Sequence, residues 1–76
     1  MSVTIRNFGN NIEVNSNNEL IESLKAYAGD SVSIQYTKPS GIKNCLLVDV
    51  SLSDDALSIK DSHSGAAIGD FNHLFH

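Results

Sequence analysis

Cations and cysteine are both scarce in this sequence, and each scarcity excludes something. Five Lys and Arg residues stand against nine Asp and Glu residues, which gives a formal net charge of −4. Proteins that bind nucleic acid or anionic membranes usually gather cations on one face, because phosphates must be neutralised there. The few, scattered cations therefore argue against direct binding of either. A basic protein partner is electrostatically easier to bind.

The single cysteine, Cys45, excludes an intramolecular disulfide. It precedes an apolar run and has no histidine beside it in the sequence, so a half-buried structural thiol is expected instead of a nucleophile. No apolar stretch reaches the length of a membrane-spanning helix, and the N-terminus lacks the pattern of a signal peptide. We therefore expect a cytoplasmic protein.

Motifs of catalysis and metal binding are also missing. His63, His73 and His76 are not joined by further ligands at metal spacing, so neither a metal nor a cofactor is expected. The adjacent carboxylates Asp54 and Asp55 are typical of a turn, whereas general acid–base catalysis needs two carboxylates that face one another in a cleft. No nucleophile motif or phosphate-binding glycine loop occurs. The sequence thus predicts a protein that is not an enzyme.

What is present is an alternation of apolar and polar residues, interrupted by turns rich in Asn, Ser and Gly. The 76 residues suffice for one domain, 1–76. The chemistry of Gly and Asn predicts a turn at 9–11. The alternation predicts strands at 2–8, 12–14, 31–37, 45–53 and from 57 onward, with a weak strand at 66–68.

One amphipathic helix is predicted over residues 16–28. Ser16 and Glu19 match a capping box, with Asn17 as the alternative N-cap, and Gly29 is suited to a left-handed helix end. A short helix capped by Asp70 is predicted near the C-terminus. The expected fold class is α+β, with two layers: a mostly antiparallel sheet of order β-β-α-β-β-β, packed on one main helix. All five aromatic residues are expected in the core: Phe8, Tyr27, Tyr36, Phe71 and Phe75.

The last two strong strands can be aligned with one another. Apolar residues and opposite charges agree on a single register, because cross-strand pairs of either kind are favourable. With a loop at 53–56, the predicted pairs are Leu52 with Leu57, Val50 with Ile59, and Asp49 with Lys60.

The same hairpin gathers negative charge, with four aspartates against Lys60 as the local cation. One interpretation is a solvated sheet edge whose charges prevent aggregation. The other is an acidic docking surface with an apolar centre, which speeds association with a basic partner. On the second interpretation, the partner-binding residues are Asp49, Asp54, Asp55, Asp61 and Leu47.

The helix followed by an antiparallel meander, ending in Asp55-Ala56-Leu57-Ser58-Ile59-Lys60-Asp61, resembles the small inhibitors of bacterial conflict systems. These are toxin-neutralising immunity proteins and phage anti-CRISPR proteins. The resemblance covers about half of the chain. It implies an acidic inhibitor that occludes a basic, nucleic-acid-processing partner by shape and charge. The alternative is an assembly module that forms a homodimer through a free edge strand at residues 2–8.

Overall fold

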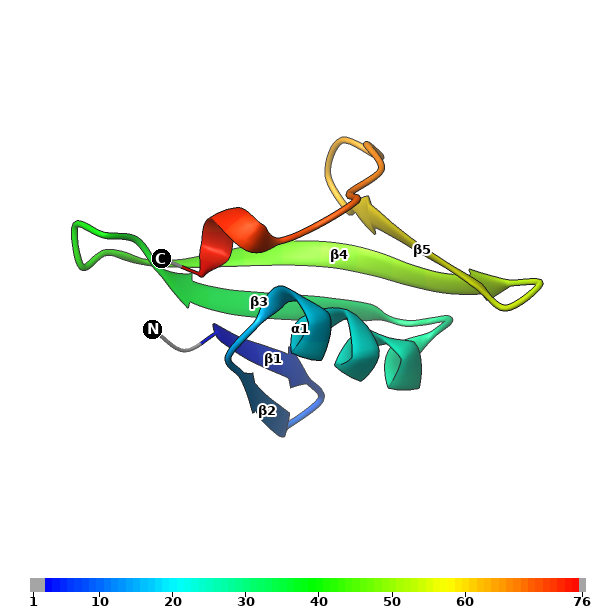
Figure 1. Ribbon diagram of the computed structural model, residues 1–76, viewed down its shortest axis with the longest axis horizontal. Coiled ribbons are helices and arrows are strands. Elements are labelled where there is room, and N and C mark those ends of the chain that lie inside the picture. Colours follow the sequence, from blue (N-terminus) through cyan, green and yellow to red (C-terminus); the bar gives the residue numbers. More distant parts are fainter. Residues whose placement is uncertain (1–2, 76) are drawn as a thin grey trace.

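The computed structural model describes residues 3–75; Ser2, the predicted start of the first strand, and His76 lie outside this range. Five strands form one antiparallel sheet in the spatial order β2-β1-β3-β4-β5 (Figure 1). The predicted α+β class and antiparallel sheet are confirmed. The strands are β1 (Val3–Asn7), β2 (Asn10–Val14), β3 (Ser31–Thr37), β4 (Lys43–Ser53) and β5 (Ala56–Asp61).

The hairpin of β1 and β2 turns at Phe8–Gly9, and the turn predicted at 9–11 is wrong. The reason is the hydrophobic register: a shift by one residue would move every apolar side chain of a strand to the opposite face. The observed register keeps the apolar residues of both strands on one face and leaves two residues for the turn. It pairs Val3 with Val14, Ile5 with Ile12, and Asn7 with Asn10.

Two further expectations about this hairpin need correction. β1 lies between β2 and β3, so the strand predicted at 2–8 is not a free edge; β2 is the edge strand. Phe8 is not in the core, because it sits in the turn with a φ of +46° and is 94% exposed. A bulky side chain in the left-handed region is uncommon, since its Cβ crowds the backbone there.

Replacing Phe8 with Asn is expected to raise the free energy of unfolding by about 0.5–1 kcal/mol, because Asn tolerates a positive φ and Asn-Gly is the preferred two-residue hairpin turn. Urea unfolding followed by circular dichroism measures the change. The control is Phe8→Ala, which removes the ring but leaves the strained conformation. An equal gain in the control would show that ring exposure, and not backbone conformation, was the cause.

The predicted helix begins as expected and ends early. In α1 (Asn17–Leu24), the hydroxyl of Ser16 accepts a hydrogen bond from the Glu19 N–H at 3.2 Å, which confirms the cap. The chain then tightens into a 3-10 turn, η1 (Lys25–Tyr27). Gly29 follows with a φ of +92°, the conformation predicted for it.

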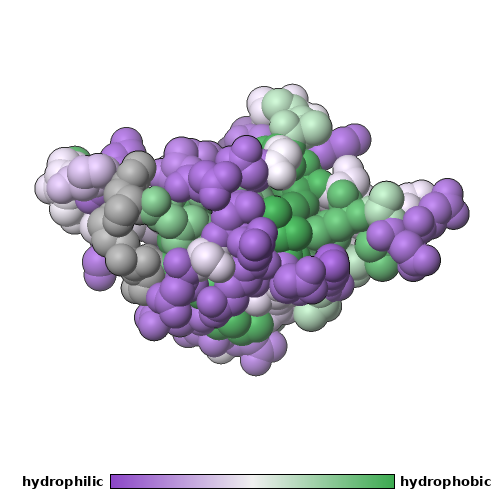
Figure 2. Space-filling view, in the orientation of Figure 1, coloured by the Kyte–Doolittle hydropathy of each residue, from purple (hydrophilic) through white to green (hydrophobic). Residues whose placement is uncertain are grey.

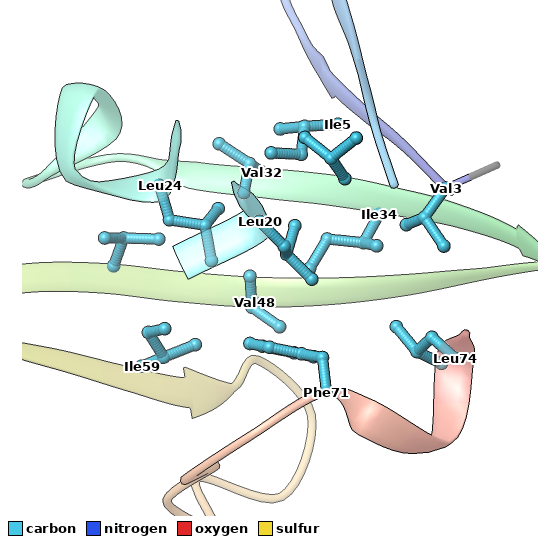
Figure 3. Packing of buried hydrophobic residues seen from close by; sticks show 12 residues of the cluster. Val3, Ile5, Leu20, Leu24, Val32, Ile34, Val48, Ile59, Phe71 and Leu74 are labelled. Atoms are coloured by element: carbon cyan, nitrogen blue, oxygen red, sulfur yellow. The ribbon is translucent and has the colours of Figure 1, made fainter. Parts of the chain in front are cut away.

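A single cluster of buried side chains joins the strands, α1 and the C-terminal segment (Figure 3). Leu20 and Leu24 come from α1, and Phe71 and Leu74 come from the C-terminal segment. The Phe71 N–H also donates to Asn17 Oδ1 at 2.7 Å, which ties this segment to the start of α1. The remaining members of the cluster are Val3, Ile5, Val14, Val32, Ile34, Val48, Val50 and Ile59.

The C-terminal segment is less regular than predicted. The short helix is a single 3-10 turn, η2 (Asn72–Leu74), although Asp70 does accept from the Asn72 N–H at 3.1 Å. The weak strand at 66–68 is reduced to one bridge between Ala67 and Lys60. Two glycines flank that strand, and glycine weakens a strand because it adds backbone entropy and no packing side chain.

Candidate functional site: the projecting acidic ribbon

The hairpin of β4 and β5 has the predicted register. Leu52 pairs with Leu57 and Val50 with Ile59, and Asp49 lies opposite Lys60. The loop is tighter than predicted, because Ser53 and Ala56 also pair and leave Asp54 and Asp55 as the turn. Both have positive φ, +51° and +64°, as a type I′ turn requires. Asp is one of the few residues that adopt this conformation readily.

This hairpin is longer than the sheet that supports it. The last pair between β3 and β4 is Ser31 with Asp49, whereas β4 and β5 stay paired as far as Ser53 and Ala56. Residues 51–58, here called the ribbon tip, therefore project beyond the end of β3 (Figure 1). The root is held by the loop after η1: the Gly29 N–H donates to the Val50 carbonyl at 2.7 Å, and the Val50 N–H to the Asp30 carbonyl at 2.9 Å.

The ribbon tip combines apolar area with negative charge. Leu52 is 48% exposed, and its cross-strand partner Leu57 is half-buried against the core. Figure 2 shows hydrophobic residues running from the centre of the molecule toward its right-hand end, where hydrophilic residues cover the extremity. Asp54 and Asp55 are exposed at that extremity, and Asp30 is exposed beside the root. An apolar centre with a charged rim is the usual composition of a protein interface.

Asp49 and Leu47 lie on a different surface, the face of the sheet turned away from the buried cluster. Leu47 is 39% exposed there. The carboxylate of Asp49 accepts a hydrogen bond from the Ser31 hydroxyl. Asp49 and Lys60 are neighbours across the ladder, but their charged groups do not form an ion pair. The single ion pair within 4 Å among residues 3–75 joins Lys25 to Glu22.

Asp61 faces the opposite way from Asp49. Asp49 pairs with Lys60, and successive residues of a strand point to opposite faces, so Asp61 lies on the inner side. Its Oδ1 accepts from the backbone N–H of His63 at 2.7 Å and of Ser64 at 3.1 Å. These two hydrogen bonds hold the pKa of Asp61 below its usual value of 3.8, and the bond from Ser64 has the larger effect of the two. This carboxylate thus shapes the turn that follows β5.

The structure therefore brings together some of the predicted site residues and separates others. Asp54 and Asp55 share the ribbon tip, Leu47 and Asp49 share the outer face, and Asp61 belongs to a turn. Leu52 was missed, because its alternation with Val50 placed it in the core. Its exposure follows from the overhang of β4 beyond β3, which only the register between these two strands reveals.

The outer face also carries a shallow cavity of about 190 Å³. Cys45 lines this cavity and is exposed, so the expectation of a half-buried thiol is wrong. Side chains alternate between the two faces of β4, and Cys45 lies on the face turned away from the core. The residues that line the cavity include neither a carboxylate nor an imidazole to accept a proton from the thiol. They are Thr4, Gln35, Tyr36, Thr37, Lys43, Asn44 and Cys45.

Neither a metal-binding cluster nor a membrane-spanning helix occurs in residues 3–75. Residues 3–75 contain no group of three or more His, Cys, Asp and Glu side chains placed to hold a metal ion. The one α-helix in this range is too short to cross a membrane. Among known proteins, no family model, no curated sequence and no solved structure matches this chain.

Proposed function

We propose that this protein binds a basic protein partner through the ribbon tip and inhibits it by occlusion. The observation that supports the proposal most strongly is the overhang: residues 51–58 extend past β3 and carry exposed Leu52 together with Asp54 and Asp55. A projecting two-stranded ribbon can enter a groove that a flat sheet face cannot. Desolvated apolar centres give such contacts their affinity, and the charged rim gives them their rate.

The charge of the ribbon tip defines the class of partner. A site that processes nucleic acid is lined with cations, because it must neutralise phosphates. An acidic ribbon competes with the phosphates of nucleic acid for these cations. We therefore assign the partner to basic, nucleic-acid-processing proteins, in line with a type of inhibitor known from bacterial conflict systems.

The remaining predicted site residues receive different roles in this proposal. Leu47 and Asp49 extend the contact onto the outer face, next to the ribbon root. Asp61 acts indirectly, since its carboxylate fixes the turn after β5. The helix α1 and the C-terminal segment form the second layer over the inner face, and they leave the ribbon tip uncovered.

The test is a capture experiment with the full chain as bait in an extract of the source cells, read by mass spectrometry. The key variant is Asp54→Asn with Asp55→Gly, because Asn-Gly is the preferred type I′ sequence and removes two charges while keeping the turn. The control is Glu19→Gln with Glu22→Gln, which removes two charges from α1. Wild type and control are expected to retain the same basic protein, and the ribbon variant is expected to lose it.

A partner that the ribbon variant retains as well as wild type does, or a partner that is itself acidic, would exclude the ribbon tip as the contact. A captured basic protein must in addition lose its nucleic-acid-processing activity when the purified chain is added, because occlusion requires that binding and activity be mutually exclusive.

A further inference from the structure

The two borders of the sheet are protected unequally. Along β5, the Ile68 N–H donates to the Ile59 carbonyl at 2.8 Å and Ala67 bridges to Lys60, so the C-terminal segment covers part of that border. At the other border, no segment within residues 3–75 pairs with the outer side of β2. An open border presents unpaired N–H and C=O groups, which can pair with another strand.

The register of the first hairpin shows which groups of β2 face outward. Asn7 and Asn10 flank a two-residue turn and form a hydrogen-bonded pair, and pairs of this kind alternate along an antiparallel ladder. Asn10, Ile12 and Val14 therefore direct their backbone groups to β1. Asn11 and Glu13 direct theirs outward.

Apart from its short length, β2 lacks the devices that usually prevent pairing at an open border. Its five residues contain no proline, and five consecutive pairs with β1 leave no room for a bulge. Glu13 is its single charged residue. Proline, bulges and several charges are the common protections, so their absence marks this strand as available for pairing.

We propose that β2 pairs antiparallel with β2 of a second copy about a two-fold axis at Ile12. In this register Asn11 of each copy lies opposite Glu13 of the other, and these are the two residues with outward backbone groups. Four intermolecular backbone hydrogen bonds result. Ile12, which is half-buried in one copy, meets its equivalent on the inner face. The contact is isologous and closes as a dimer with a continuous sheet.

The charges near β2 favour this register, and they favour another copy of the same chain as the strand that pairs with β2. On the outer face, Asn11 Oδ1 already accepts from Arg6 Nε at 3.3 Å, so Glu13 of the incoming strand meets the Arg6–Asn11 pair of the other copy. A register centred on Glu13 would set two like charges directly opposite one another, which is unfavourable. A register centred on Asn11 would place Glu13 against the turn glycine, Gly9.

The small size of β2 sets the strength of the dimer. A five-residue strand buries less area than stable interfaces do, so the dimer is reversible, with a dissociation constant of about 10 µM to 1 mM. The contact lies at the border opposite the β4–β5 hairpin, and a dimer therefore presents two ribbon tips at its far ends. Self-association and partner binding use separate surfaces.

Sedimentation velocity over a concentration series tests the proposal with the purified chain alone. Wild type is expected to show a reversible monomer–dimer equilibrium. Because the interface is two-fold symmetric, each substitution removes two equivalent charge-assisted contacts, so Arg6→Glu and Glu13→Arg are each expected to weaken the dimer at least about tenfold. The double variant R6E with E13R restores opposite charges across the interface and is expected to restore the dimer.

A second measurement separates backbone pairing from any other contact. Glu13→Pro removes an outward N–H without touching the bonds to β1, and is expected to abolish the dimer, whereas Glu13→Gln keeps that N–H and retains weak association. Amide exchange at Asn11 and Glu13 is expected to slow as the protein concentration rises. A wild type that stays monomeric up to about 1 mM, or a dimer insensitive to E13P, would overturn the proposal. So would binding of β2 to a different protein's strand without self-association.

Discussion

Reversing the charge of the ribbon tip, by Asp54→Lys with Asp55→Lys, is expected to slow association with the basic partner at least about tenfold at low salt. The two carboxylates form the turn at the end of the hairpin that projects beyond β3, where they face an approaching partner. Raising the ionic strength should shrink the difference, because the Debye length falls to about 8 Å at physiological salt. Stopped-flow or surface-plasmon kinetics at several salt concentrations give the rates.

Two further variants separate the effect of charge from the effects of turn conformation and apolar contact. The variant Asp54→Asn with Asp55→Gly keeps the turn conformation and is expected to slow association less than the reversal does, because it removes charge without inverting it. Leu52→Ser is expected to act on the dissociation rate instead, because Leu52 supplies apolar contact and no charge. An association rate that the lysine variant leaves unchanged at low salt would remove electrostatic guidance from the mechanism.

Replacing Phe71 with Ala is expected to lower the free energy of unfolding by about 3–5 kcal/mol. The ring is fully buried in the cluster, and a domain of this length has a total stability of only about 4–11 kcal/mol. The variant is therefore expected to be partly unfolded at room temperature, although Phe71 itself belongs to no helix or strand. Urea unfolding measures the loss of stability, with thermal unfolding as a check.

The matched control lies two residues along the same segment. His73 is exposed in η2, so His73→Ala is expected to change the stability by less than about 0.5 kcal/mol. Equal stabilities of the two variants would mean that the C-terminal segment does not close the core. A large loss for Phe71→Ala alone would show that Phe71 and the η2 turn beside it are part of the folding unit.

The sequence predicted the β4–β5 hairpin well because three independent signals agreed there. Leucine, valine and isoleucine alternate along both strands, turn residues separate them, and Asp49 lies opposite Lys60 in the register that these signals define. β3 and the N-terminus of α1 were predicted for similar reasons, since alternation and a serine cap leave little choice.

Prediction failed where local signals pointed in different directions. The Asn-rich segment after Gly9 has strong turn chemistry, yet the turn forms one residue earlier. The observed register pairs Ile5 with Ile12 on the buried face, whereas a three-residue turn at 9–11 would put them on opposite faces. Phe8 was assigned to the core as an aromatic residue, but the same register forces it into the turn. Tertiary burial outweighs local turn preference in this hairpin.

The candidate site was predicted in part for a comparable reason. The turn at Asp54 and Asp55 followed from residue type, whereas the separation of Asp49 from Asp61 depends on strand faces. The predicted pairing of Asp49 with Lys60 already implied that Asp61 points the opposite way. The exposure of Leu52 depends on where β3 ends relative to β4, and this long-range register has no signature within the hairpin itself.

The eleven residues of β4 pair with two different strands along the length of β4. β3 pairs with its first part and β5 with its last, and the two pairings share only Val48 and Asp49. Residues 51–58 lie beyond the bonds that join Val50 to Gly29 and Asp30, so this ribbon tip can open without breaking any backbone bond of the rest of the sheet. Local opening in such a segment requires far less free energy than global unfolding. The hairpin end can thus adapt its twist to a bound surface while the rest of the sheet keeps its shape.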